Sequence, residues 1–90
     1  MTYYFYLARC SDGSLYSGSC VDLQAREAKH NEGKGAKYTR SRKPVKIVYH
    51  EEFATLVDAR RREAQVKKWS EVKKERLTLG KHPTKGTQIK

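Results

Sequence analysis

The chain has 90 residues, of which 37% are hydrophobic and 33% are charged, and its formal net charge is +10. This length suits a single small domain that buries roughly 60% of the surface of its unfolded chain. No apolar run reaches the roughly 18 residues of a membrane span, and the first residues lack the charged start of a secretory signal. We therefore expect a cytoplasmic protein without a membrane partner, whose excess of basic residues favours polyanions, and nucleic acid first.

The N-terminal segment predicts a β-hairpin. Residues Tyr3 to Ala8 are almost all aromatic or aliphatic, as in a short strand that is covered on both faces. Ser11 to Ser14 have the composition of a tight turn, and Leu15 to Cys20 are expected to form the second strand. The two cysteines, Cys10 and Cys20, lack a metal-type spacing, so we expect two reduced thiols.

The turn sequence allows two registers of this hairpin. A two-residue Asp-Gly turn would pair Leu7 with Gly18 and place Tyr6 and Tyr16 on opposite faces of the sheet. A three-residue loop with Gly13 in a left-handed conformation at a bulge would instead pair Tyr6 with Gly18. The two tyrosines would then share one face. Gly18 also indicates that a backbone or a ligand approaches closely. These residues alone leave both registers open.

The rest of the chain predicts alternating helical and extended segments. In chain order we expect a helix over Leu23–Asn31 capped by Asp22, a basic loop over Asn31–Pro44, a strand over Val45–Phe53, a long helix over Leu56–Trp69 capped by Thr55, and a short helix capped by Ser70 that runs to Leu77. The order ββαβα(α) indicates an α+β fold, with a small three-stranded antiparallel sheet flanked by helices. Residues 1–79 would form the domain, and residues 80–90 a flexible basic tail.

One carboxylate has an unusual position on the expected long helix. At about 100° per residue, one stripe of this helix faces the sheet and holds Leu56, Ala59, Glu63 and Val66. A carboxylate there is costly unless it is paired with a base or bound to a cation. Glu63 is therefore either half of a salt bridge or a metal ligand at the edge of a cleft.

The expected short helix carries polar residues at intervals of one turn. Asp22, Arg26 and His30 are spaced four residues apart and so share one face. One interpretation is a solvated salt-bridge ladder with a surface histidine. The other is that Arg26 binds a phosphate, because its guanidinium fork matches phosphate oxygens. His30 would then hydrogen-bond the phosphate or shuttle a proton.

Together these residues resemble the GIY-YIG nuclease family, and most of all its small stand-alone bacterial branch. Three segments between about Tyr3 and Leu77 carry the resemblance: YYFYLARCSDGSLYSG, DLQAREAKHNEGKGAKYT and REAQVKKW. Tyr4 replaces the first glycine of the family motif, and Ser19 stands where the DNA-repair members carry lysine. The resemblance implies the three-residue loop, since the two motif tyrosines of the family line one site.

The resemblance also implies a reaction, which is metal-dependent endonuclease hydrolysis of phosphodiester bonds in DNA or RNA. Glu63 would bind a single Mg²⁺ or Mn²⁺, and Arg26 would neutralise charge on the phosphate. Tyr6 would orient the attacking water and pass its proton towards His30. Tyr16 would hold Tyr6 or the phosphate by a hydrogen bond.

Basic residues around this site would grip the nucleic-acid backbone without reading its sequence, and binding would be salt-sensitive. The expected contacts are Lys34, Lys37, Tyr38, Arg40, Arg42, Lys43, Lys67 and Lys68, together with Arg60, Arg61 and Arg62; Tyr38 is expected to stack on an unpaired base. We expect a monomer or weak dimer that takes further specificity from a partner protein. The alternative is a non-catalytic basic binding module, which needs the charge but not Glu63.

Overall fold

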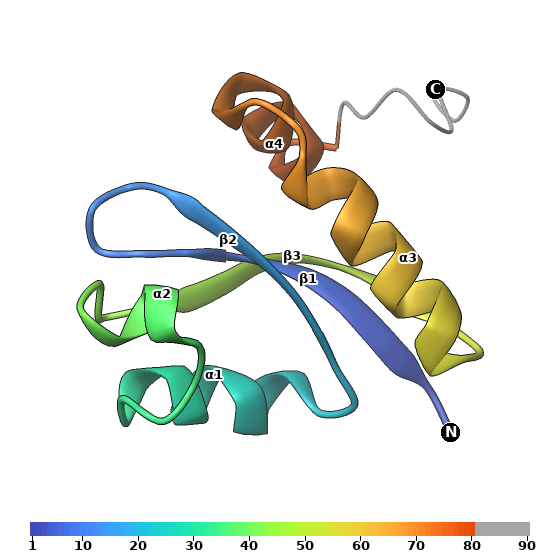
Figure 1. The fold of residues 1–90 in the computed structure, drawn as a ribbon, viewed down its shortest axis with the longest axis horizontal. Helices are drawn as coiled ribbons and strands as arrows, with labels where there is room; N and C mark the ends of the chain where they lie inside the picture. Colours follow the sequence, from blue (N-terminus) through green and yellow to red (C-terminus); the bar gives the residue numbers. More distant parts are fainter. Residues whose placement is uncertain (81–90) are drawn as a thin grey trace.

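The computed structural model describes residues 1–80 and contains one sheet and four helices among them. The elements are β1 (Tyr3–Arg9), β2 (Leu15–Cys20), α1 (Leu23–Asn31), α2 (Lys37–Arg40), β3 (Lys46–Phe53), α3 (Leu56–Lys67) and α4 (Glu71–Thr78). The strands form an antiparallel sheet in the order β2-β1-β3 (Figure 1). The predicted α+β fold is confirmed. Residues 81–90 of the predicted tail lie outside the described residues.

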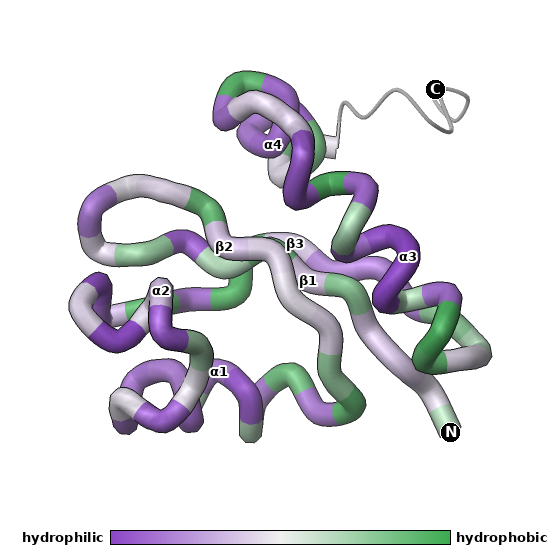
Figure 2. The backbone as a smooth tube through the Cα atoms, in the orientation of Figure 1, coloured by the Kyte–Doolittle hydropathy of each residue, from purple (hydrophilic) through white to green (hydrophobic). Residues whose placement is uncertain are grey.

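The central strand β1 is buried on both faces, as its continuous apolar sequence predicted. Phe5 and Leu7 join a core with residues of α3 and α4, whereas Tyr6 and Ala8 join a second core that Leu23 of α1 packs against. This division follows from the alternation of side chains along a strand. Hydrophilic residues predominate in α1 and α3 (Figure 2), so these helices cover the sheet with a narrow apolar stripe. In residues 1–80, no helix is long and apolar enough to cross a membrane.

The hairpin has the register of a three-residue loop. The Cys10 N–H donates a 2.9 Å hydrogen bond to the Ser14 carbonyl, and Tyr6 stands opposite Gly18. Tyr6 and Tyr16 therefore lie on one face, with their ring centroids 6.4 Å apart. Of the two registers that the turn sequence allowed, the one that groups the tyrosines is confirmed.

The three predicted helix caps are formed by short polar side chains. Asp22, Thr55 and Ser70 accept hydrogen bonds from the backbone N–H three residues later, at 3.0, 3.1 and 3.2 Å respectively. Each cap satisfies a donor that the first turn of a helix leaves without an intrahelical partner. The N-termini of α1, α3 and α4 could thus be located from the sequence.

The prediction of an irregular loop throughout residues 31–44 is wrong, because residues 37–40 form the single helical turn α2. Isolated short helices are unstable, so local sequence gave no sign of it. Tertiary contacts hold it: Thr39 is fully buried and bonds to His30, and the Arg42 side chain donates to the Tyr38 carbonyl. The helix α3 ends at Lys67 rather than at the predicted Trp69, and its last turn is closed by the Lys68 N–H, which bonds to the Gln65 carbonyl, and by the Trp69 N–H, which bonds to the Val66 carbonyl.

An ion pair fastens α4 to the hairpin. Arg9 of β1 donates two parallel hydrogen bonds to the Glu75 carboxylate of α4. In addition, the Glu71 carboxylate accepts a 3.4 Å hydrogen bond from the Leu15 N–H at the start of β2. The hydrogen bond to Arg9 lowers the pKa of Glu75. These contacts place α4 beside the first residues of β2.

The hairpin loop gives a first testable prediction. Gly13 has a φ of +88°, a left-handed conformation that costs other residues about 1–2 kcal/mol. Gly13→Ala should therefore lower the free energy of unfolding by about 1 kcal/mol and the melting temperature by about 4–8 °C. Ser11→Ala, an exposed change in the same loop, is the control and should leave both unchanged. Equal melting temperatures of Gly13→Ala and wild type would contradict the bulged loop.

Candidate functional site

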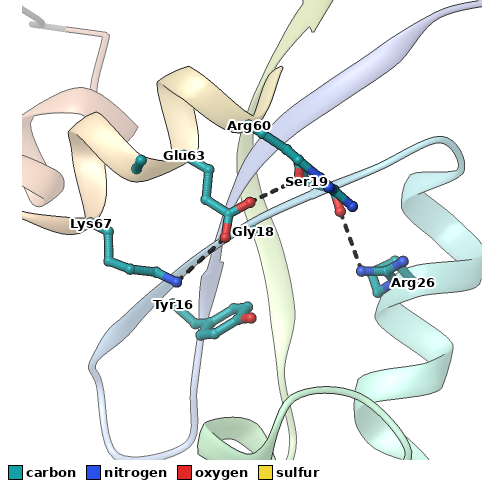
Figure 3. Close-up of a pocket in the computed structure, with 8 residues that line it drawn as sticks. Tyr16, Gly18, Ser19, Arg26, Arg60, Glu63 and Lys67 are labelled. Atoms are coloured by element: carbon teal, nitrogen blue, oxygen red, sulfur yellow. Dashed lines mark hydrogen bonds and ion pairs between the residues drawn. The ribbon is translucent and has the colours of Figure 1, made fainter. Parts of the chain in front are cut away.

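A cleft of about 450 Å³ opens across the edge strand β2. Its lining residues come from β2, α1 and α3, and they are Tyr16, Gly18, Ser19, Arg26, Arg60, Glu63, Ala64 and Lys67 (Figure 3). Three predicted catalytic residues, Tyr16, Arg26 and Glu63, thus meet although they are distant in sequence. An edge strand allows this, because helices that cover opposite faces of the sheet can both reach its free side.

Two neighbours hold the Glu63 carboxylate in the cleft. The Ser19 hydroxyl donates a 2.7 Å hydrogen bond to one oxygen, and the Lys67 ammonium lies 3.4 Å from the other. The Lys67 side chain is 56% exposed, and such helix pairs contribute only about 0.3–0.5 kcal/mol. Glu63 is therefore not half of a buried ion pair on which the fold depends. The hydrogen bond from Ser19 to Glu63 is a contact that the sequence did not reveal.

The Arg26 guanidinium points to the cleft from α1 (Figure 3). It donates a 3.3 Å hydrogen bond to the Ser19 carbonyl, and no carboxylate of residues 1–80 lies within salt-bridge distance of it. The alternative of a salt-bridge ladder is wrong, since the Asp22 carboxylate caps α1 instead. Arg26 thus keeps most of its donors for an anion in the cleft.

Behind the cleft, Tyr6 and His30 begin a directed chain of hydrogen bonds. The Thr39 hydroxyl donates to the Ala36 carbonyl at 2.9 Å, so it accepts from Nδ1–H of His30 at 2.8 Å. Nε2 of His30 then accepts the Tyr6 hydroxyl proton, with 2.8 Å between the two atoms. His30 is only 1% exposed, so the interpretation as a surface histidine is wrong.

Burial sets the protonation of this chain. Burial raises the pKa of Tyr6, and the neighbouring Tyr16 raises it further. Burial also raises the pKa of Tyr16. The pKa of His30 is lowered by burial and by the positive charge of Arg26. At neutral pH, both tyrosines are thus protonated and His30 is neutral, as the hydrogen bond from Tyr6 requires.

Two glycines make room for these aromatic side chains. A Cβ atom at Gly18 would lie 2.5 Å from the Tyr6 hydroxyl oxygen, and one at Gly35 would lie 2.3 Å from Nδ1 of His30. The prediction of a close approach at Gly18 is confirmed, and the approaching group is the Tyr6 ring. Because Gly18 also lines the cleft, the fully buried Tyr6 hydroxyl lies directly beneath the cleft floor.

The predicted nucleic-acid contacts separate into free and engaged side chains. Arg62 is 9% exposed and pairs with Glu51 at 2.9 Å, and Arg42 pairs with Asp12 at 2.9 Å. These two arginines therefore stabilise the fold rather than extend into solvent. The exposed basic residues of the predicted set are Lys34, Lys37, Arg40, Lys43, Arg60, Arg61, Lys67 and Lys68.

The Tyr38 ring is also largely engaged. It stacks with Tyr16 at 6.0 Å between centroids, and the Arg42 guanidinium lies 3.9 Å from its centroid. Its hydroxyl donates a 2.7 Å hydrogen bond to Ser14. These contacts leave less of the ring for stacking on a base than the sequence suggested.

The described residues contain no group of three or more histidine, cysteine or carboxylate side chains arranged to hold a metal ion. In the cleft, Glu63 supplies a carboxylate that the Ser19 hydroxyl contacts, and Tyr16 lines the same cleft. Such an oxygen set fits a hydrated Mg²⁺ or Mn²⁺, because Mg²⁺ keeps several waters and takes further oxygens from a substrate phosphate.

Comparison with known proteins identifies the family of this chain. Residues 2–76 match the family model of the GIY-YIG catalytic domain. The chain therefore belongs to the GIY-YIG family, as its motifs predicted. The GIY-YIG domain is a nuclease fold, so membership indicates nuclease activity and contact with nucleic acid.

Within this family the chain is similar to the UPF0213 proteins. One from Bacillus pumilus is 53% identical over 73 residues, or 81% of this chain and 74% of that protein. One from Staphylococcus aureus is 47% identical over 76 residues, which are 84% of this chain and 93% of that protein. The solution NMR structure of the UPF0213 protein of Bacillus halodurans matches with a TM-score of 0.56 at 43% identity, covering 98% and 95% of the two chains. The solution NMR structure of the protein EF2693 from E. faecalis matches with a TM-score of 0.59 at 39% identity, covering 89% of this chain and 85% of that chain.

The buried histidine predicts a pH dependence of stability. Because the pKa of His30 is lower in the folded state than the usual value of about 6.5, the unfolded chain binds more protons as the pH falls below that value. The stabilisation is present above about pH 6.5 and is lost as the pH falls towards the pKa of the folded state. Denaturant unfolding between pH 8 and 5.5 should show this loss for wild type and for the control His50→Gln, but not for His30→Gln. An equal slope in both variants would contradict it.

Proposed function

We propose that this protein is a metal-dependent endonuclease that hydrolyses phosphodiester bonds of DNA or RNA, selecting backbone or structure rather than sequence. The observation that carries this proposal is the meeting of Arg26, Tyr16 and Glu63 in one open cleft, with a cationic rim from Arg60 and Lys67. This set offers donors for a phosphate, a carboxylate for a divalent cation and a hydroxyl for hydrogen bonding. Membership of a nuclease family supports the same reaction.

The basic residues of the cleft would hold the scissile phosphate. Arg26 has no carboxylate partner within residues 1–80, so its fork is available for two phosphate oxygens. It would stabilise the negative charge that builds on phosphorus as the nucleophile adds. Arg60 and the Lys67 ammonium would add positive charge at the rim, and Tyr16 would hydrogen-bond a phosphate oxygen.

Glu63 is the residue that would hold the divalent cation, with Ser19 fixing one carboxylate oxygen. When bound, Mg²⁺ or Mn²⁺ would supply Lewis-acid polarisation of the phosphoryl oxygen and charge stabilisation at the leaving oxygen. In the free protein, the Lys67 ammonium lies beside the Glu63 carboxylate and offsets part of its negative charge. It would turn towards the phosphate when a cation takes its place.

The chain from Tyr6 to His30 would take up the proton of the attacking water. This step requires the backbone to shift at Gly18, because the Tyr6 hydroxyl is fully buried beneath the cleft floor. The pKa of Tyr6 is raised by burial, so it cannot serve as a stored tyrosinate base at neutral pH. It can accept a proton only as its own hydroxyl proton passes to Nε2 of His30, which is neutral and already accepts that hydrogen bond. The water proton would end on Tyr6, and the former Tyr6 proton on His30.

The first test of this function is the removal of the Glu63 charge. Glu63→Gln keeps an oxygen that can accept from Ser19 but lacks the negative charge that binds a cation. We expect cleavage of labelled single-stranded, duplex and branched DNA and RNA in Mg²⁺ or Mn²⁺ to fall at least about a hundredfold, with no cleavage in EDTA. Glu52→Gln, an exposed change on β3, is the matched control and should cleave as wild type does.

The melting temperature of Glu63→Gln should stay close to that of wild type, because the lost Lys67 pair is exposed. Binding without cleavage in every metal, unchanged by Glu63→Gln, would overturn the nuclease and leave a basic binding module.

A second test separates the geometry of Arg26 from its charge. Arg26→Lys keeps one positive charge but loses the planar fork, so we expect the cleavage rate to fall by about 10²–10³. The affinity measured in EDTA, which comes mostly from several backbone contacts, should change much less. Arg61→Lys, an exposed change outside the cleft, should alter neither. An equal loss of rate and affinity would assign Arg26 to binding alone.

A further inference from the structure

A second cleft of about 400 Å³ lies beside the first, over the preceding residues of β2. The two clefts share Tyr16 and Lys67, but the first lies over Gly18 and Ser19 and the second over residues 15–17. The two clefts are therefore neighbours along β2. A nucleic-acid strand that enters one cleft would pass directly beside the other.

The walls of the second cleft differ in chemistry from those of the first. Leu15 and the stacked pair of Tyr16 and Tyr38 give it an apolar and aromatic lining. On the opposite side, α4 contributes Glu71 and the 8% exposed Lys74, whose charged groups lie 3.5 Å apart. An aromatic wall with a few polar groups suits a nucleobase, which has both an apolar face and hydrogen-bonding edges.

One polar atom at this cleft lacks a partner. Ser17 lines the cleft and is 2% exposed, and its hydroxyl makes no hydrogen bond with any of residues 1–80. Buried polar groups are almost always hydrogen-bonded, so an exception indicates a missing partner. A small rotation of the Ser17 side chain would allow this hydroxyl to hydrogen-bond a polar group bound in the cleft.

We propose that the second cleft binds the base and sugar of one unpaired nucleotide, next to the phosphate held in the first cleft. This assignment rests on the proposed function, and it narrows the substrate to a strand with an unpaired or extruded nucleotide at the cleavage site. A paired base stays inside its stack and does not reach such a cleft. Ser17, Glu71 and Lys74 offer the base or sugar both donors and acceptors.

The test uses small ligands in EDTA, so that it does not depend on cleavage. Deoxynucleoside 3′,5′-bisphosphates would be titrated into uniformly ¹⁵N-labelled full chain, and the base-free deoxyribose 3′,5′-bisphosphate would serve as the matched ligand. We expect the nucleoside bisphosphates to shift the backbone amides of Leu15, Ser17 and Lys74 and to bind at least about fivefold more tightly, as burial of a base against the apolar lining of the second cleft predicts. The base-free ligand should shift only the first cleft, at Ser19 and Glu63.

Two neighbouring lysines provide matched variants. Lys74→Met should weaken nucleoside binding at least about threefold, whereas Lys73→Met should not, since the Lys73 ammonium lies over the Trp69 ring, 4.3 Å from its centroid. Equal effects of both variants, equal affinity of the two ligands, or shifts confined to the first cleft would each overturn the subsite. If Lys74→Met fails to fold, the wild-type titrations decide alone. If oligonucleotides are cleaved but the nucleoside bisphosphates bind no more tightly than the base-free ligand, the nuclease proposal stands and the subsite is rejected. If the nucleoside bisphosphates bind more tightly but no oligonucleotide is cleaved, the subsite stands and the nuclease proposal is rejected.

Discussion

The contact between the Tyr6 ring and Gly18 is the constraint on which the site depends. The two residues stand opposite one another on neighbouring strands, and no atom larger than hydrogen fits between the Gly18 Cα and the Tyr6 hydroxyl. This contact exists only in the register of the three-residue loop. A slip by one residue would turn Tyr16 to the other face, away from His30. The Gly13 bulge therefore determines whether Tyr6, Gly18 and Tyr16 meet on one face of the sheet.

The second constraint is the free side of β2. At a central strand, a ligand can contact only the side chains on one face of the sheet. At an edge strand, helices on opposite faces of the sheet can both reach the same ligand. Here Arg26 comes from α1 and Glu63 from α3, and Ser19 of β2 bonds to both: its carbonyl accepts from the arginine and its hydroxyl donates to the carboxylate. One serine thus sets the separation of the anion-binding and cation-binding groups. Edge strands also invite pairing with other chains, and the charged side chains that α1 and α3 bring to this edge oppose that.

The basic residues of this chain have two different roles, in ion pairs within the fold and in the positive charge of the surface. Arg9, Arg42 and Arg62 each form an ion pair with a carboxylate, at Glu75, Asp12 and Glu51 respectively. These pairs fasten α4, the basic loop and α3 to the sheet. The remaining cations are mostly exposed and give the surface its positive field. Of the 20 lysine and arginine side chains, these three arginines are therefore less available to a polyanion than the exposed ones.

The sequence by itself determined the fold class and the starts of α1, α3 and α4, and the resemblance of its motifs to a known family pointed to Tyr16, Arg26 and Glu63. The fold class and the helix starts follow from local chemistry, such as the short polar side chains at helix caps, and Glu63 also stood out as an isolated carboxylate on an apolar stripe. Only the tertiary structure decided the register of the hairpin, the helical turn α2 and the burial of His30. It also showed which arginines are engaged and that Ser19 supports Glu63. Each of these depends on contacts between residues far apart in the chain, and spacing along a sequence carries no information about which distant side chains meet.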